Sequence, residues 1–321
     1  VMKKLIMNIL LLTGVLLASC GDDGSVKIVS LNTFGSKVCM NDRVKVFVSA
    51  AIDSDETPTY EWGCTGGSMT NPQGLFENIW QAPMTPGEYE VWVTVKCGSS
   101  KETRRTKMTV LDELFYSDFE TPYYNEGYSN TSMTLAQDAN TGSLKLTSSK
   151  EKGVFQRNWN DETLVPPYSM QMRYNPQTFS GSNAFDLRIA FSSISGVSKD
   201  LRNINFSVEP LTGNCKIYSE FFNKETGNIE SFSTTVATIN ELKFTKKWKY
   251  LSMSIDSSNK LIVYLDGVKL VENNFLTNFF PQSAYPIKGS GVALSNKAVV
   301  LIDDMTVLIN GEICNATERI R

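Results

Sequence analysis

A short tyrosine-rich segment contains the side chains best suited to bind a ligand. Tyr123, Tyr124, Asn125 and Tyr128 stand close together in Tyr-Tyr-Asn-Glu-Gly-Tyr, a stretch typical of a loop. Tyrosine combines a flat apolar ring with a polar hydroxyl, and an asparagine amide both donates and accepts hydrogen bonds. These groups could stack on a sugar and hydrogen-bond it, with Trp159 at the same rim. They could equally pack over the edge of a sheet.

Three strand-like stretches carry polar side chains that alternate with apolar ones. Because side chains in a strand point alternately to opposite faces, the polar members should share one face of a sheet. Planar amide, guanidinium and carboxylate groups on such a face could bind a sugar, but the solvated face of any antiparallel sheet has the same pattern. The polar members are Gln171, Arg173, Asp186, Arg188, Asn205 and Ser207.

The composition excludes several classes of function. The chain contains no histidine, which excludes Ser-His-Asp and Cys-His catalysis and every histidine-ligated metal site. Its formal net charge is -3 and it has no run of basic residues. Nucleic acid is therefore not an expected partner.

The first residues have the pattern of a secretory signal. Lys3 and Lys4 precede an apolar run from Leu5 to Leu17, which is shorter than the roughly 20 residues that cross a bilayer. Leu-Ala-Ser-Cys, ending at Cys20, resembles the bacterial lipobox. That resemblance implies that 1–20 is a lipoprotein signal peptide and that Cys20 is lipidated and held in membrane lipid. The alternative is an ordinary signal peptide with an incidental cysteine.

A short acidic tether, 21–25, follows the lipobox. Its Gly-Asp-Asp-Gly sequence is similar to the export signal that places lipoproteins of Bacteroidetes on the outer face of the outer membrane. The resemblance implies a lipid-anchored protein of the outer membrane that faces the cell exterior. A solvated linker would have the same composition.

The remaining cysteines are odd in number, so at least one must be free or pair outside the chain. Their spacing fits no zinc pattern. We expect Cys97 to pair with Cys39 or Cys64, and Cys215 and Cys314 to be buried or free. An oxidising compartment would permit such pairs.

The mature chain is predicted to be all-β. Short runs rich in β-branched and aromatic residues are separated by Gly, Asn, Asp, Ser and Pro, and almost nothing indicates a helix. About seven strands are expected in 26–111 and about a dozen in 112–321. We therefore expect two domains with these bounds.

The segment 26–111 resembles PKD-like and bacterial immunoglobulin-like β-sandwich domains. The motifs are Tyr-Glu-Trp ending at Trp62, Gly-Gly-Ser at 66–68, Trp-Gln-Ala-Pro at 80–83 and Pro-Gly-Glu-Tyr-Glu-Val at 86–91. The resemblance implies that Trp62 is a core tryptophan and Tyr89 a tyrosine corner. Such domains are mostly spacers or adhesion modules. Alternation in the strand at 88–95 predicts that Trp92 points away from the core.

The segment 112–321 resembles the concanavalin A-like group, which includes laminin G-like domains and several carbohydrate-binding modules. Three features carry the resemblance: Asp118-Phe119-Glu120, the hairpin from Trp248 to Gly267, and Ile-Asp-Asp-Met-Thr-Val at 302–307. The resemblance implies a two-sheet jelly roll. We expect Asp266-Gly267 to form the positive-φ turn of the hairpin, and Trp248 to lie in the core.

Related jelly rolls often hold a calcium ion where the first and last strands lie side by side. The resemblance implies such a structural ion, because carboxylate oxygens suit calcium. The alternative is that the acids are strand-end caps or sheet-edge charges. Enzymes of this fold usually carry Glu-x-Asp-x-x-Glu on one strand, a string absent here. The expected ligands are Asp118, Glu120, Asp303 and Asp304.

These observations favour a non-catalytic, surface-exposed lipoprotein. The immunoglobulin-like domain would act as a spacer and the jelly roll would bind a glycan. The first alternative is a protein-binding adhesin or assembly factor that uses Trp92 or the outer sheet, and the second is a glycoside hydrolase-like enzyme.

Overall fold

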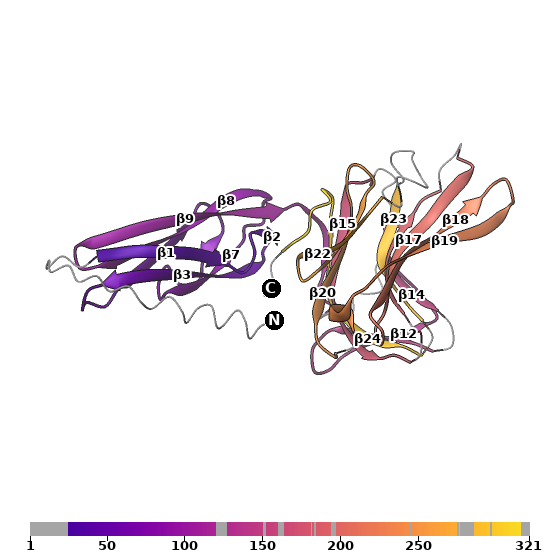
Figure 1. Ribbon diagram of the computed structural model, residues 1–321, viewed down its shortest axis with the longest axis horizontal. Helices are drawn as coiled ribbons and strands as arrows, with labels where there is room; N and C mark the ends of the chain where they lie inside the picture. Colours follow the sequence, from indigo (N-terminus) through magenta and orange to yellow (C-terminus); the bar gives the residue numbers. More distant parts are fainter. Residues whose placement is uncertain are drawn as a thin grey trace.

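A computed structural model describes residues 25–119, 127–149, 152–159, 164–180, 182, 184–193, 197–243, 245–274, 276, 286–295 and 297–315. Within these ranges the elements are strands and one short 3-10 turn, η2 (Asn240–Leu242). They form two β-sandwiches joined at 112, an N-terminal and a C-terminal one (Figure 1). The predicted all-β class is thus observed. Within the described ranges, no helix has the length and apolar character that crossing a bilayer requires.

The N-terminal sandwich consists of two facing sheets. One has the order β1 (Ser25–Thr33), β3 (Arg43–Asp53), β7 (Glu77–Gln81), β5 (Ser68–Met69). The other has the order β2 (Lys37–Cys39), β9 (Ser100–Leu111), β8 (Gly87–Cys97), β4 (Thr59–Cys64), β6 (Gln73–Gly74).

Alternation along β8 determines which side chains form this core. Val91, Val93 and Val95 are fully buried, as the pattern predicts. Trp92 points the other way, but it is half-buried rather than exposed, because the Arg105 guanidinium lies 4.9 Å from its ring centroid. This cover reduces the surface that Trp92 offers to a partner protein.

Two aromatic residues stabilise the N-terminal sandwich as the sequence predicts. Trp62 is buried, and its Nε1 donates to the Leu75 carbonyl oxygen at 2.9 Å. The Tyr89 hydroxyl donates to the Thr85 carbonyl oxygen at 2.9 Å, which is the backward bond of a tyrosine corner. Whether this sandwich belongs to the immunoglobulin-like group stays a prediction.

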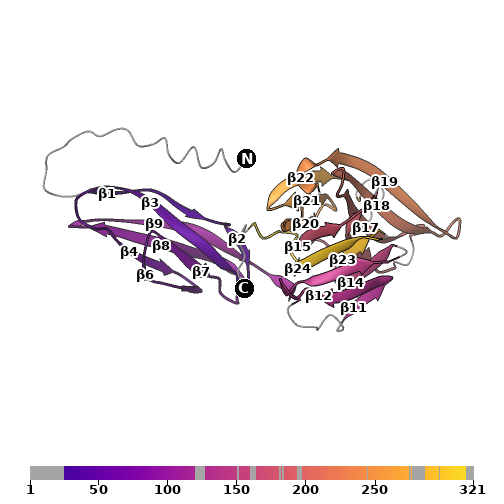
Figure 2. The same ribbon diagram turned by 90° about the horizontal axis from the view of Figure 1, so that it is seen from below.

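The C-terminal sandwich also has two facing sheets, which we call proximal and distal (Figures 1 and 2). The proximal sheet has the order β12 (Met133–Gln137), β13 (Leu144–Ser148), β24 (Val299–Leu308), β15 (Tyr168–Thr178), β20 (Lys249–Ile255), β21 (Leu261–Leu265), β22 (Val268–Asn273), with β10 (Glu113–Ser117) beside β24. The distal sheet has the order β11 (Tyr128–Thr131), β14 (Gly153–Asn158), β23 (Ile287–Leu294), β16 (Phe185–Phe191), β17 (Lys199–Glu209), β18 (Asn214–Asn223), β19 (Asn228–Thr238).

The proximal sheet lies next to the N-terminal sandwich, and the distal sheet lies on the far side of the shared core (Figure 1). Tyr174, Phe185 and Phe206 are fully buried in that core, and the rings of Tyr174 and Phe185 stack at 4.8 Å. Stacked aromatic pairs add to the stabilisation that burial alone provides. The core therefore holds the two sheets in a fixed relation.

Two local features of the C-terminal sandwich agree with the sequence. Asp266 and Gly267 have φ values of 48° and 77°, so both adopt the left-handed conformation that a tight hairpin turn requires. The first strand of the sandwich, β10, pairs antiparallel with the last, β24, with Tyr116 opposite Thr306. The opening and closing segments therefore lie side by side, as the resemblance implies.

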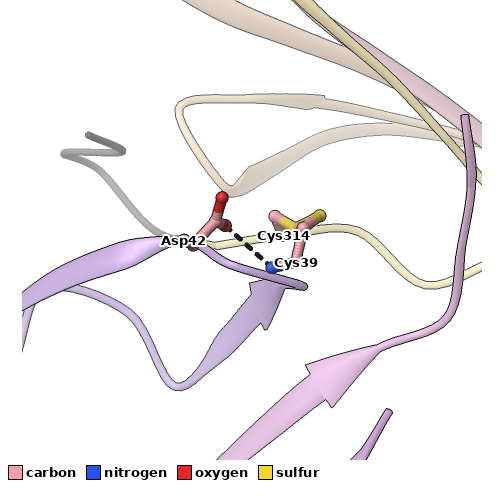
Figure 3. Close-up of side chains that lie close together, drawn as sticks. All are labelled: Cys39, Asp42 and Cys314. Atoms are coloured by element: carbon pink, nitrogen blue, oxygen red, sulfur yellow. Dashed lines mark hydrogen bonds between the residues drawn. A yellow bond between two sulfur atoms is a disulfide. The ribbon is translucent and has the colours of Figure 1, made fainter. Parts of the chain in front are cut away.

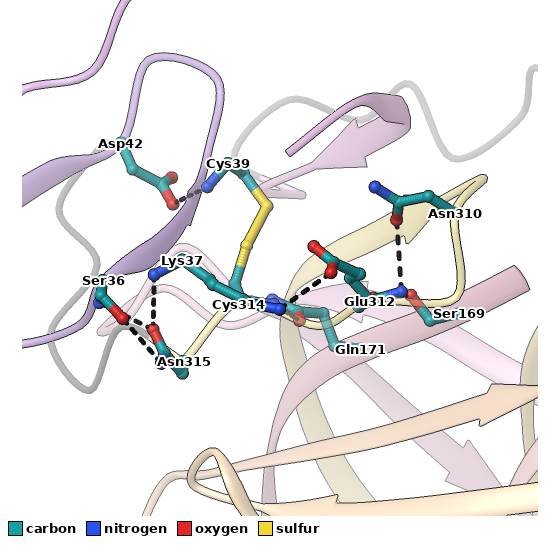
Figure 4. The surroundings of a disulfide bond; sticks show 10 residues. All are labelled: Ser36, Lys37, Cys39, Asp42, Ser169, Gln171, Asn310, Glu312, Cys314 and Asn315. Carbon is teal, nitrogen blue, oxygen red and sulfur yellow. Dashed lines mark hydrogen bonds and ion pairs between the residues drawn. A yellow bond between two sulfur atoms is a disulfide. The ribbon is translucent and has the colours of Figure 1, made fainter. Parts of the chain in front are cut away.

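A disulfide between Cys39 and Cys314 joins the two sandwiches (Figures 3 and 4). Cys39 ends β2, and Cys314 lies in the segment after β24, 275 residues later. Next to the bond, the Asn315 N–H donates to the Lys37 carbonyl oxygen at 2.9 Å, and Lys37 Nζ lies 2.8 Å from Glu312 Oε1. The expected pairing of Cys97 with Cys39 or Cys64 is therefore wrong.

The spacing of the cysteines could not reveal the observed pair, because the segment after β24 brings Cys314 back to the end of β2. The sulfur atoms of Cys39 and Cys314 and a carboxylate oxygen of Asp42 lie within 4.8 Å of one another, close enough to suit a metal. Because the sulfurs are bonded to each other, neither is a thiolate ligand. One Asp42 oxygen also accepts the Cys39 backbone N–H at 2.8 Å (Figure 3).

Non-reducing peptide mapping of the chain from residue 21 should recover Cys39 linked to Cys314. Cys64, Cys97 and Cys215 should react with a thiol reagent once the protein is denatured. Replacing both linked cysteines by serine should lower the free energy of unfolding by about 2–4 kcal/mol, because the unfolded chain regains the entropy of an open loop. A peptide that links Cys97 to Cys39 or Cys64 would contradict the structure.

Candidate functional site

The outer side of the distal sheet carries a continuous set of polar side chains, which we call the distal face. Asp186 and Arg188 lie on it because their strand neighbours Phe185, Leu187 and Ile189 point into the core. The predicted alternation is thus observed in β16. The polar residues of the distal face are Gln156, Asn158, Asp186, Arg188, Asn203, Asn205, Ser207, Tyr218 and Glu220.

Hydrogen bonds fix the central part of the distal face. Arg188 Nε donates to Gln156 Oε1 and its Nη1 to Asn205 Oδ1, both at 3.4 Å. Asn205 donates to Asn203 Oδ1 at 2.5 Å, and Asn203 donates to Glu220 Oε2 at 2.7 Å. Burial lowers the pKa of the Arg188 guanidinium. The planar groups are therefore held in one arrangement before any ligand arrives.

A glycine makes the contact between Arg188 and Gln156 possible. Gly291 of β23 lies opposite Gln156 on one side and Arg188 on the other. A Cβ at Gly291 would lie 2.1 Å from the Phe155 carbonyl oxygen, closer than real contacts allow. Because Gly291 has no side chain, β14 can approach β23 and nothing separates the side chains of Gln156 and Arg188.

One end of the distal face contains a buried ionic cluster. Asp186 is 3% exposed. Its Oδ2 accepts a hydrogen bond from the Tyr218 hydroxyl and lies 2.8 Å from Lys152 Nζ. Lys152 Nζ in turn lies 4.6 Å from the centroid of the Tyr218 ring. Burial first, and then the negative charge of Asp186, raise the pKa of Tyr218. Asp186 Oδ1 is buried without a hydrogen-bond partner among the described residues.

Two hollows lie on the distal face. A groove of about 890 Å³ runs past Gln156, Asn158 and Arg188 to Arg202 and Phe222. A smaller pocket of about 340 Å³ is lined by Lys152, Asp186, Ser207 and Tyr218, with further serines. Asp186 and Arg188 are two residues apart on β16, about 7 Å, so the two hollows are adjacent.

Other predicted binding residues lie elsewhere. Gln171 and Arg173 alternate with core residues as expected, but in β15 of the proximal sheet. Gln171 is buried, and its Oε1 accepts the Cys314 backbone N–H at 3.0 Å. Arg173 lies 4.8 Å from the ring centroid of Trp248, which is half-buried on this outer surface rather than in the core. The structure thus does not place these two residues with Asp186 and Arg188.

Tyr128 and Trp159 lie together at one end of the sandwich. Tyr128 stacks on Phe155 at 4.8 Å, and burial raises its pKa to about 12. Trp159 donates to the Tyr168 hydroxyl at 3.1 Å and lies edge-on to Phe115. Both residues line a hollow of about 370 Å³, which shares Asn158 with the groove on the distal face. For Tyr128 this geometry favours packing over the sandwich edge.

Four residues of the predicted sites lie in a segment that is not described. Tyr123, Tyr124, Asn125 and Glu120 lie outside the described residues, so their expected roles stay predictions. The same is true of Cys20 and the signal segment.

The predicted calcium ligands Asp303 and Asp304 lie at a β-bulge. The register of β15 against β24 shifts between Gln171 and Arg173, and Asp304 has a φ of 46°. The bulge turns both carboxylates toward Arg173, whose Nη1 lies 3.2 Å from Asp304 Oδ2 and 3.7 Å from Asp303 Oδ2. Consecutive strand residues would otherwise point to opposite faces.

These acids fit a cation only in part. Asp304 accepts hydrogen bonds from Tyr116 at 2.6 Å and from Tyr250 at 3.0 Å, in addition to its ion pair with Arg173. Burial first, and then the charge of Asp304, raise the pKa of Asp303 to about 7, and Asp118 adds to this effect. A bound cation would relieve that repulsion, but Arg173 already supplies positive charge. The calcium ion stays a prediction.

Several residues of the distal face escaped the sequence analysis. Lys152 lies just before β14, Gln156 lies in β14 and Tyr218 lies in β18. Register, rather than local pattern, brings them beside Asp186 and Arg188. The available signal was the alternation Lys-Ile-Tyr-Ser-Glu at 216–220, which places Tyr218 and Glu220 opposite the core side chain of Ile217.

No protein-family model and no curated protein matches the chain. Solved structures of low identity are similar to it. A protein of unknown function with a galectin-like fold from Bacillus subtilis is 10% identical, with a TM-score of 0.43, over 62% of this chain and 98% of that one. The Emp47p carbohydrate recognition domain is 14% identical, with a TM-score of 0.38, over 58% of this chain and 89% of that one.

The binding domain of botulinum neurotoxin serotype D is 12% identical, with a TM-score of 0.37, over 63% of this chain and 49% of that one. The chain thus spans about half the length of that domain. At these TM-scores the likeness carries no argument about what this chain binds.

The raised pKa of Asp303 predicts a pH-dependent stability. Its folded pKa of about 7 exceeds the unfolded value of about 3.9, so between these values the folded state keeps a proton that the unfolded state has lost. The free energy of unfolding should therefore fall as the pH rises. With chelator present, wild type should lose about 2 kcal/mol more than Asp303→Asn between pH 5 and 8 in urea unfolding. Equal losses would contradict the assignment.

The same proteins test the calcium ion. Calcium bound at Asp303 would keep it ionised, so calcium should raise the melting temperature of the wild type at pH 8 and leave Asp303→Asn unchanged. A wild-type melting temperature that calcium does not alter would remove the ion from the site.

Proposed function

We propose that this chain is a non-catalytic surface lipoprotein that binds a glycan on the distal face. The observation that carries the proposal is that Gln156 and Arg188 line a groove of about 890 Å³ and are hydrogen-bonded to each other, while the buried amides of Asn205 and Asn203 hold Arg188 from behind. Sugars present many hydroxyl groups in fixed directions. Donors and acceptors that are already fixed lose little entropy when they bind such a ligand.

The groove also offers apolar surface for the carbon faces of a sugar ring. Phe222 lines it and is half-buried, with Arg202 5.6 Å from its ring centroid, and the edge of the buried Phe191 closes the groove beside it. Aromatic rings beside planar polar groups give a pocket that takes an amphipathic ligand. This combination supports a glycan over a purely apolar ligand.

The position of the distal sheet supports a role in display. It lies on the side of the C-terminal sandwich away from the N-terminal sandwich (Figure 1). In a protein anchored through Cys20, the N-terminal sandwich would act as a spacer of immunoglobulin-like type. The distal face would then point away from the outer membrane.

Glycan retention tests the binding site. The chain from residue 21 should be retarded in gels that contain its polysaccharide ligand, found first on a glycan array. Asn205→Ala should weaken retention about tenfold, equivalent to about 1.4 kcal/mol, because Arg188 loses the acceptor that fixes its guanidinium in the groove. Thr94→Ala, on the N-terminal sandwich, should leave retention unchanged.

Three outcomes would contradict this proposal. The first is that no glycan binds while a control lectin binds on the same array. The second is that both variants behave as wild type. The third is sustained release of sugar by the purified protein, which would favour the hydrolase alternative.

Metabolic labelling tests the anchor. Cells grown with an alkyne-bearing palmitate should label the wild-type protein but not Cys20→Ala, because only the lipobox cysteine is acylated. Cys215→Ala should keep the label. External protease should digest the wild type on intact cells. Full protection from that protease would show that the protein does not face the exterior.

A further inference from the structure

The groove on the distal face is lined by an excess of positive charge. Arg188, Arg202, Lys224 and Lys288 contribute to its lining, and the acid that contributes is Asp200. This excess occurs in a chain whose net charge is -3. The groove is therefore positively charged on a molecule that otherwise repels anions.

Three cations of the groove differ from cations elsewhere in the chain that form ion pairs. Lys37, Lys152 and Lys260 each form an ion pair with an acid. In contrast, Arg188, Arg202 and Lys288 form no ion pair within 4.0 Å among the residues that the structure describes. The cations of the groove repel one another, and an anion from outside would relieve that repulsion.

Arg188 has the geometry of an anion receptor. Its Nε and Nη1 donate to Gln156 and Asn205, but its Nη2 donates to no group in the described ranges. The planar guanidinium presents donors in a fork that matches a carboxylate or a sulfate. The guanidinium is half-buried, where its charge is less screened than on an open surface.

The opposite end of the distal face has the opposite preference. Asp186 Oδ1 is buried and has no hydrogen-bond partner among the described residues, so it can accept a hydrogen bond from a neutral hydroxyl but would repel an acid. Lys152 already pairs with the other oxygen of Asp186. Charge therefore changes along the distal face, from a hydrogen-bond acceptor at Asp186 to the positive side chains of Arg188, Arg202 and Lys288.

We infer that the ligand of the distal face is an acidic glycan, whose carboxylate or sulfate groups bind between Arg188, Arg202 and Lys288. A neutral hydroxyl of the same glycan, about 7 Å away, donates to Asp186. This inference rests on the proposed glycan-binding function and specifies the class of glycan. The two sources of acidity, uronic acids and sulfate esters, share the same chemistry.

Pairs of polysaccharides that share a sugar backbone but differ in charge show whether binding depends on the charge. Polygalacturonate and dextran sulfate are compared with their neutral counterparts, fully methyl-esterified polygalacturonate and dextran, by affinity electrophoresis of the chain from residue 21. At least one acidic polymer should retard the protein about tenfold more than its neutral counterpart. Raising the salt from about 0.05 to 0.5 M should weaken that retention, because ions screen the groove.

Substitutions then locate the effect. Arg202→Gln combined with Lys288→Gln should weaken acidic-polymer binding about tenfold or more, equivalent to about 1.4 kcal/mol. Arg105→Gln combined with Lys260→Gln removes the same charge from other surfaces and should change binding less than about twofold. Arg188→Lys keeps the charge but loses the fork, so it should weaken binding with little further change in salt dependence. Melting curves confirm that each variant is folded.

The outcomes separate this inference from the proposed function. Retention by neutral polymers alone, or equal retention of each matched pair, overturns the acidic ligand while glycan binding stands. Equal losses in the groove and control variants also overturn it. Retention by no polysaccharide, acidic or neutral, overturns both. Single-stranded DNA that binds as tightly as the acidic polymers would show a general polyanion surface and overturn the glycan assignment.

Discussion

Alternation of side chains along the strands constrains both the interior and the binding surface of the C-terminal sandwich. Phe185, Leu187 and Ile189 must enter the core, so Asp186 and Arg188 between them must point outward. A slip of one residue in β16 would exchange the two sets and bury both charges against apolar side chains. The stability of the core therefore fixes the positions of the groups on the distal face.

The distal face differs from an ordinary solvated sheet surface in its burial. Asn203, Asn205 and Ser207 are almost inaccessible, although they point away from the core. Polar groups that are removed from water are stable only when they are hydrogen-bonded, and most of these are bonded to one another. Asp186 Oδ1 is the exception within the described part of this surface. A missing partner in a well-satisfied network is more informative than an exposed polar side chain.

The sequence predicted what depends on local pattern. The three strand-like stretches that carry Gln171, Asp186 and Asn205 are observed as β15, β16 and β17, and the Asp266 turn has the expected conformation. It could not predict which strands share a sheet, because register joins residues far apart in the chain. Arg173 and Arg188 have the same pattern, yet Arg173 lies in the proximal sheet and Arg188 in the distal sheet. The Cys39–Cys314 bond and the bulge at Asp304 were missed for the same reason.

The chain crosses between the sandwiches at 112, and the bond between Cys39 and Cys314 connects them a second time. Two bodies joined at one point can swivel, whereas two bodies joined at two points can at most hinge about the line between them. A pull on the C-terminal sandwich is then divided between two covalent paths. The strands of either sandwich carry less of that load, and a cut in one path leaves the other intact.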